Sequence, residues 1–151
     1  MVEQSDYGDP SGLFVAVSKA AGHGLDVGVS DDRLVLQHGC YILNRWGFGP
    51  FFDYPLFIHG PYSTALADAY FSGYDSGLGT DVPDEAVSRL SEVFSHGMAY
   101  GEAYVTLMLI IEMNPGEPND VVIRQAQMIK PRLSPEIWMA TGELFQHEHV
   151  G

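Results

Sequence analysis

Hydrophobic residues recur every three or four positions over most of this chain, which is the spacing typical of helices that bury one face. The stretch 84–97 shows the pattern most simply. Val87, Leu90 and Phe94 follow Asp84 at helical spacing, and Gly97 comes three residues after Phe94. Because N-capping residues, prolines and glycines separate such stretches, we expect a succession of helices joined by short loops.

The stretch 30–47 predicts a core helix. Leu36, Cys40 and Leu43 share one stripe, and further apolar residues lie beside it, so the apolar face is wide. Ser30 is expected to cap this helix and Gly47 to end it. Gly39 stands in the middle, where glycine costs ~1 kcal/mol relative to alanine. We therefore expect another helix to cross closely at Gly39.

One stretch breaks the helical pattern. Residues 48–57 are rich in aromatic residues, glycine and proline, and with the preceding Gly47 they read GFGPFFDYPLF. They predict an irregular hairpin or extended segment, either part of the core or an exposed patch that builds a dimer. The following sequence IHGPYSTAL is expected to turn the chain into a helix. Pro61 would open that helix, Ser63 or Thr64 would cap it, and Tyr62 would pack against the core helix.

Together these patterns predict a mainly α fold in a single domain over residues 1–151. We expect about six helices and a small β-hairpin or extended element, and a winged-helix-like arrangement is one form that such a fold could take. The next-to-last helix is expected to begin at Asn119, and the last at Ser134 as its cap. Residues 1–8, which are acidic, are expected to be flexible.

Charge changes this picture most. The chain has 20 Asp and Glu against 7 Lys and Arg, a formal net charge of −13, and its only lysines are Lys19 and Lys130. It could be an ordinary acidic bacterial protein. Scarce lysine and abundant aspartate favour a cytosolic protein of a salt-accumulating halophile, in which dense salt screens the self-repulsion.

Composition also limits the cellular location that we expect for the chain. No apolar run approaches the roughly 20 residues that a membrane helix needs. Cys40 is the single cysteine, so an internal disulfide framework is excluded. The acidic N-terminal stretch does not resemble a secretory signal. We therefore expect a cytoplasmic protein without membrane contact.

Few residues carry candidate chemistry. His59, Tyr62 and Ser63 offer an acid, a base and a nucleophile, but their spacing fits no catalytic triad, so a hydrolase is the least favoured function. Glu102 and Glu112 lie ten residues apart on an apolar helix, where we expect one solvated edge; a buried carboxylate there would indicate function. The sequence HEH at 147–149 has poor spacing for a metal, and no phosphate-binding loop occurs. We expect no cofactor, no metal and no enzymatic activity.

The tail of the chain admits a nucleic-acid interpretation. It predicts two helices joined by a short turn, and Arg124, Lys130 and Arg132 fall within nine residues there. A helix-turn-helix protein places its second helix in the major groove, yet this second helix carries glutamates and no Lys or Arg. A DNA-binding regulator is therefore the alternative, and the net charge disfavours it.

Three stretches carry a resemblance to a known family. RLVLQHGCYIL at 33–43 resembles the Leu-Gln-Lys-x-x-Tyr-x-Leu helix of the YwgA-like proteins. FIHGPYSTALADAYF at 57–71 resembles their His-Gly-Pro-Tyr-Ser-x-x-Leu corner, and IKPRLSPEIWMA at 129–140 is similar to a third pattern of the family. His38 and Gly39 depart from it, because the family has lysine and a large apolar residue there.

The resemblance implies a role in interaction. The family comprises small bacterial and archaeal proteins without an established activity, and it is distantly similar to Panacea-type antitoxin domains, which bind protein partners. This implies a non-enzymatic, antitoxin-like interaction or regulatory module with a protein partner or a homo-oligomer. The matched positions that become candidate binding residues are Gln37, Tyr41, His59, Tyr62 and Ser63.

Overall fold

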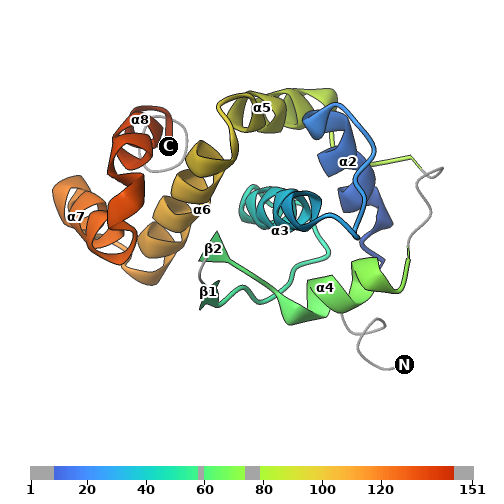
Figure 1. Ribbon diagram of the computed structural model, residues 1–151, viewed down its shortest axis with the longest axis horizontal. Coiled ribbons are helices and arrows are strands. Elements are labelled where there is room, and N and C mark those ends of the chain that lie inside the picture. The colour runs from blue at the N-terminus through green and yellow to red at the C-terminus, as the bar shows by residue number, and fades with distance from the viewer. Residues whose placement is uncertain (1–8, 58–59, 74–78, 145–151) are drawn as a thin grey trace. The chain divides into compact units, whose positions relative to one another are not determined.

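Helices make up most of the computed structural model, which describes residues 9–57, 60–73 and 79–144 (Figure 1). The mainly α prediction is confirmed, and the described residues contain seven α-helices where about six were expected. The expectation for residues 1–8 lies outside the described residues. The helices are α2 (Ser11–Ala21), α3 (Ser30–Arg45), α4 (Thr64–Phe71), α5 (Asp84–Ser95), α6 (Met98–Met113), α7 (Asn119–Ile129) and α8 (Ser134–Leu144).

The predicted small β element is present. Strands β1 (Leu56–Phe57) and β2 (Gly60–Pro61) pair antiparallel, with Leu56 opposite Pro61. Pro61 was expected at the start of a helix, and that prediction is wrong because the strand pairing holds it in β2. The helix α4 begins three residues later, and the Ser63 hydroxyl caps it by accepting a hydrogen bond from the Leu66 N–H at 3.1 Å.

Two other capping predictions are wrong. The N-cap of α3 is Val29 and not Ser30, which lies inside the first turn and makes no capping bond. Ser134 lies inside α8, and its hydroxyl donates to the Pro131 carbonyl, because the 3₁₀ helix η1 (Pro131–Leu133) runs directly into α8. A serine before an apolar run predicts a nearby helix start better than it predicts the cap.

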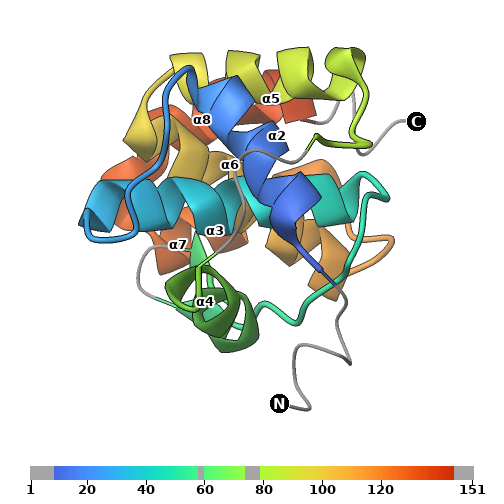
Figure 2. The same cartoon turned by 90° about the vertical axis from the view of Figure 1, so that its right-hand side faces the viewer.

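The chain divides into two compact units, Met1–Ser95 and His96–Gly151. The single domain expected over both of them stays a prediction. In the first unit α2 packs against α3 and α5, and β2 packs against α3 (Figures 1 and 2). Phe14, Leu36, Ile42 and Leu90 are fully buried in this unit.

Helix α2 runs across α3 (Figure 2), and Gly39 lies in the middle of α3. A methyl group at Gly39 would lie 2.7 Å and 2.8 Å from the two methyl carbons of Val17 on α2, and 3.2 Å from the Phe94 ring on α5. Real carbon atoms do not approach so closely. The predicted close crossing is confirmed, because the Val17 side chain occupies the space that a side chain at position 39 would need.

The aromatic segment mixes exposed and half-buried side chains over residues 48–56, the part whose burial the structure describes. Phe51, Asp53 and Pro55 are exposed, whereas Phe52 and Tyr54 are half-buried, so exposure alternates along an extended chain. Over these residues the segment is therefore not simply part of the core, and its expected role in building a dimer stays a prediction. One face of the segment lies on the protein and the other faces solvent.

In the second unit α6 packs against α7 and α8, and α7 packs against α8 (Figure 1). Every residue of α6 from Tyr100 to Ile111 is buried, which agrees with its apolar sequence. Glu112 is exposed, as expected, but Glu102 is buried, so the predicted solvated edge does not include it. Among the described residues, no helix is long and apolar enough to cross a membrane.

Candidate functional site

The corner at residues 60–66 is tied to α3 by one buried side chain. The Gln37 side-chain oxygen accepts a hydrogen bond from the Ser63 N–H at 2.8 Å, and its Nε2 donates to the Ser63 carbonyl at 2.9 Å. The same Nε2 lies 3.3 Å from the Tyr70 hydroxyl oxygen. A side-chain amide thus bonds both backbone groups of Ser63, whose carbonyl also accepts from the Ala67 N–H of α4 at 3.0 Å.

Of the candidate catalytic residues of this corner, the two that the structure describes, Tyr62 and Ser63, are engaged in structural contacts. Ser63 is buried, and its hydroxyl is the α4 cap. Tyr62 is half-buried, with its hydroxyl oxygen 3.5 Å from that of Tyr70. The aromatic residue buried here is Tyr70 and not Tyr62, and burial raises the pKa of Tyr70. His59 lies outside the described residues.

Two further α3 side chains hold the segment that leads to the corner. Tyr41 is buried and packs edge-on against Tyr54, with 5.1 Å between the ring centres. The Asn44 amide nitrogen donates to the Phe48 and Pro50 carbonyls at 2.7 Å and 2.8 Å. Its oxygen accepts from the Phe52 N–H and the Tyr54 hydroxyl.

Gln37, Tyr41 and Asn44 therefore form one stripe of α3 at i, i+4 and i+7 that holds residues 48–54 and Ser63. Gln37 and Tyr41 were predicted as candidates from the sequence and Asn44 was not, although its position seven residues after Gln37 places it on the same stripe. The four described binding candidates of this region (Gln37, Tyr41, Tyr62 and Ser63) contact one another or the connecting segment. Their contacts are those of a structural support.

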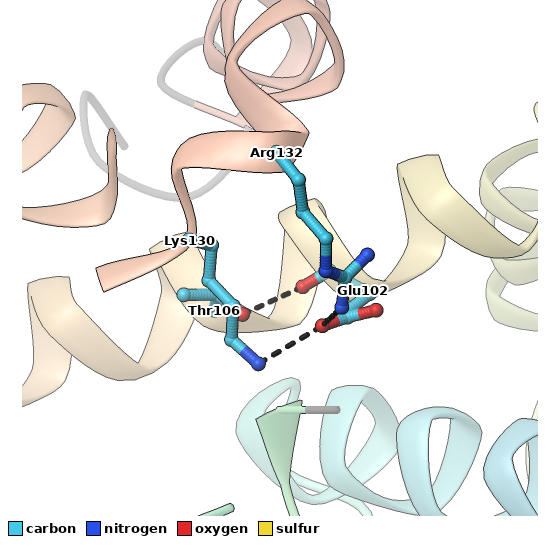
Figure 3. Close-up of polar contacts among 4 residues, drawn as sticks. All are labelled: Glu102, Thr106, Lys130 and Arg132. Atoms are coloured by element: carbon cyan, nitrogen blue, oxygen red, sulfur yellow. Dashed lines mark hydrogen bonds and ion pairs between the residues drawn. The ribbon is translucent and has the colours of Figure 1, made fainter. Parts of the chain in front are cut away.

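The second unit contains a buried ion cluster (Figure 3). The Glu102 carboxylate on α6 accepts hydrogen bonds from Lys130 Nζ and Arg132 Nη2, each at 2.9 Å. Glu102 and Lys130 are buried, while the Arg132 side chain is 56% exposed. Burial raises the pKa of Glu102, but the bonds and charges of Lys130 and Arg132 outweigh burial, so its pKa lies below the ordinary value.

This cluster accounts for two of the three cations in the candidate nucleic-acid site. Lys130 and Arg132 both reach inward to the same carboxylate from the segment that joins α7 to α8 (Figure 3). Arg124, on α7, is exposed. The expected basic patch is therefore reduced to Arg124 and the outer part of Arg132 in the described structure.

The second unit carries exposed apolar side chains that were not predicted from the sequence. Trp138 and Met139, neighbours on α8, are 64% and 59% exposed, and Met128 at the end of α7 is 75% exposed. The sequence SPEIWMATGEL carried a signal for this, because it places apolar residues on opposite sides of one helix. Ile137, Ala140 and Leu144 form the buried side, so Trp138 and Met139 cannot.

A cavity of about 380 Å³ lies in the first unit. Asp9, Phe48, Thr80 and Asp81 are among its lining residues, and none of the candidate residues from the sequence lines it. Asp9 and Asp81 are both exposed, and the Asp9 carboxylate accepts from the Ser11 N–H at 3.0 Å. The cavity therefore offers no buried polar group that would point to a ligand.

Within residues 9–57, 60–73 and 79–144, no group of three or more His, Cys, Asp or Glu side chains is placed to hold a metal ion. His147 and His149 lie outside that part of the chain. Comparisons of the chain with protein-family models, with curated proteins and with solved structures found no match.

Proposed function

We propose that this chain is a non-enzymatic protein-interaction module of the YwgA-like, antitoxin-like kind and acts in the cytoplasm of a halophile. The observation that carries the proposal is the pair Trp138 and Met139, both mostly exposed on one helix. Leaving two large apolar side chains in water forgoes burial worth roughly 1.5–3 kcal/mol each. Exposed apolar groups of this size are typical of surfaces that bind partners.

Residue type supports the same proposal. Tryptophan is enriched among the residues that dominate binding energy at protein interfaces. Methionine is flexible and polarisable, and it is common on surfaces that adapt to a partner. The resemblance of the Gly-Pro-Tyr-Ser corner to the YwgA-like family, and more distantly to Panacea-type antitoxin domains, points to a protein partner as well.

The alternatives have less support. A hydrolase would need an accessible nucleophile, and Ser63 is buried with its hydroxyl engaged at the start of α4. A DNA-binding regulator would need free cations, and Lys130 and Arg132 are paired with Glu102. The corner supports α4 and the connecting segment, so we place the binding surface on α8 instead.

The proposal is tested by affinity capture from the host's lysate in molar KCl, with the eluate assayed for protein and nucleic acid. The tagged chain is compared with Trp138→Ser/Met139→Ser and with Phe51→Ser, a control of equal exposure in the first unit. We expect a stoichiometric protein partner that the control retains and the double variant loses. Nucleic acid without any protein would reject the proposal and direct attention to Arg124 and Arg132.

A further inference from the structure

The outward side of α8 is apolar along its whole described length. Pro135, Trp138, Met139 and Gly142 stand at i, i+3, i+4 and i+7, so they share one face of the helix, and all four are exposed. The opposite face packs inward through Ile137, Ala140, Thr141 and Leu144. We call the four exposed residues the outer face of α8. No charged side chain interrupts it.

Two carboxylates border this face on the same side. Glu136 and Glu143 are seven residues apart, so they lie above one another along one edge of the helix. Both are half-buried, as expected at the border between the inward and outward faces. Glu143 Oε1 accepts a hydrogen bond from the Tyr100 hydroxyl at 2.5 Å, which fixes the position of this carboxylate.

We propose that the outer face of α8 binds an amphipathic helix of a protein partner that carries Lys or Arg along one edge of its apolar stripe. This inference rests on the proposed function and names the chemistry of the partner. The partner's apolar stripe would cover Trp138 and Met139, and its cations would lie along Glu136 and Glu143. Helix-in-groove recognition of this kind uses apolar anchors at helical spacing, and the bordering charges set orientation.

Charge distinguishes this partner from the other possible occupants. A second copy of the chain would bring its own outer face, but α8 contains no Lys or Arg, so the carboxylates would meet no cation. Two chains of net charge −13 also repel one another. An anionic lipid surface would repel the chain for the same reason, since helices that lie on such membranes carry cations on their polar face.

The test uses the full chain and three synthetic helical peptides. The first has a leucine stripe with lysines along one edge, the second has glutamates in place of those lysines, and the third is a scramble of the first. Trp46→Phe leaves Trp138 as the only tryptophan, so its fluorescence reports binding directly. Anisotropy of the labelled peptides with the unmodified chain gives an independent measure.

We expect the lysine peptide to bind at least about tenfold more tightly than the other two and to shift Trp138 emission to the blue. In the anisotropy measurement, Trp138→Ser and Met139→Ser each weaken binding about tenfold or more. Glu136→Gln weakens it about two- to fivefold, and the matched control Glu92→Gln, an exposed glutamate on α5, leaves it unchanged.

Equal binding of the scrambled peptide would overturn the inference, because the apolar stripe would then not matter. Equal binding of the glutamate peptide would overturn it as well, because the cations would not matter. So would self-association of the chain, or binding to phospholipid vesicles, that Trp138→Ser abolishes. If no peptide binds while the lysate partner is still captured by Trp138→Ser/Met139→Ser, this inference is wrong and the interaction module stands. If no protein is captured at all, both are wrong.

Discussion

Gln37 fills with its side chain the place that a neighbouring strand would take beside Ser63. Its amide has the same donor and acceptor as a peptide group, and it bonds the Ser63 N–H and carbonyl at 2.8 Å and 2.9 Å. Gln37 and Ser63 are both buried, so water cannot replace these bonds. The Ser63 carbonyl also accepts from the Ala67 N–H at 3.0 Å, so the energetic role of Gln37 is to prevent the Ser63 N–H from being buried without a partner.

Replacing Gln37 by Ala should lower the free energy of unfolding by about 1–3 kcal/mol, because it leaves the buried Ser63 N–H without a partner, while the Ser63 carbonyl keeps its bond from the Ala67 N–H. Urea denaturation at fixed KCl measures this loss. Gln127→Ala, at a half-buried glutamine on α7, is the control and should change it by less than about 1 kcal/mol. A loss below about 1 kcal/mol at Gln37 would show that the corner does not depend on this amide.

Glu102 makes stability depend on pH in a definite direction. Its pKa in the folded chain lies below the ordinary 4.5. The carboxylate therefore stabilises the fold above pH 4.5, and this contribution is lost as the pH falls from 4.5 through the lowered folded pKa. The Glu102 side chain is buried with Lys130, so the effect belongs to this cluster and is poorly screened by salt.

We expect Glu102→Gln to cost about 3 kcal/mol at pH 7, since it removes the charge partner of a buried lysine. The difference in unfolding free energy between wild type and Glu102→Gln should shrink as the pH is lowered below 4.5. Glu92→Gln, an exposed control, should show no comparable change. A difference that stays constant from pH 6 to pH 3 would contradict the assignment.

Among the elements, the helices could be predicted because their signals are local. Apolar spacing, Gly22 and Gly97 stops and the Ser63 cap lie within the segments that they define. Pro61 could not be placed correctly because its state depends on pairing with Leu56 across the turn. Likewise, nothing local to Glu102 reveals that Lys130, 28 residues away, will reach it.

The close crossing of α2 and α3 can be tested by changing the residues that meet there. Gly39→Ala should lower stability by about 1–3 kcal/mol despite the better helix propensity of alanine, because its methyl group would overlap Val17. Urea denaturation of Gly39→Ala, Val17→Ala and the double variant forms a cycle. The double variant should lose less than the sum of the two single losses.

Gly142→Ala on α8 is the matched control for that cycle, since nothing lies within 4 Å of its added methyl group. It should raise stability by up to about 1 kcal/mol. Equal effects of alanine at positions 39 and 142 would mean that helix propensity, and not the close crossing, decides both.

For the whole molecule, the net charge of −13 on 151 residues is the dominant property. Self-repulsion of this size destabilises a compact chain unless salt screens it. The self-repulsion could be predicted from composition alone, because it depends on the number of charges and not on their placement. The outer face of α8 could not, since which apolar side packs inward is decided by α6 and α7.

The melting temperature should therefore climb steeply between low and molar KCl, by roughly 10 °C or more, a shift that corresponds to a few kcal/mol. Thermal unfolding followed by circular dichroism measures it. Sucrose of equal osmolality should produce a smaller rise, because it does not screen charge. A flat response to KCl would count against the halophile hypothesis.

Because Lys130 is buried, chemical labelling of its amine can report when the second unit opens locally. Of the two lysines, Lys19 is exposed on α2, whereas Lys130 is 6% exposed and held by Glu102. An acylating reagent can modify Lys19 in the folded chain but reaches Lys130 only when the second unit opens locally. Cys40, the single thiol, is fully buried, so an alkylating reagent likewise reaches it only when the first unit opens locally. Two orthogonal labels, read by mass spectrometry, would thus time the opening of each unit separately in one sample.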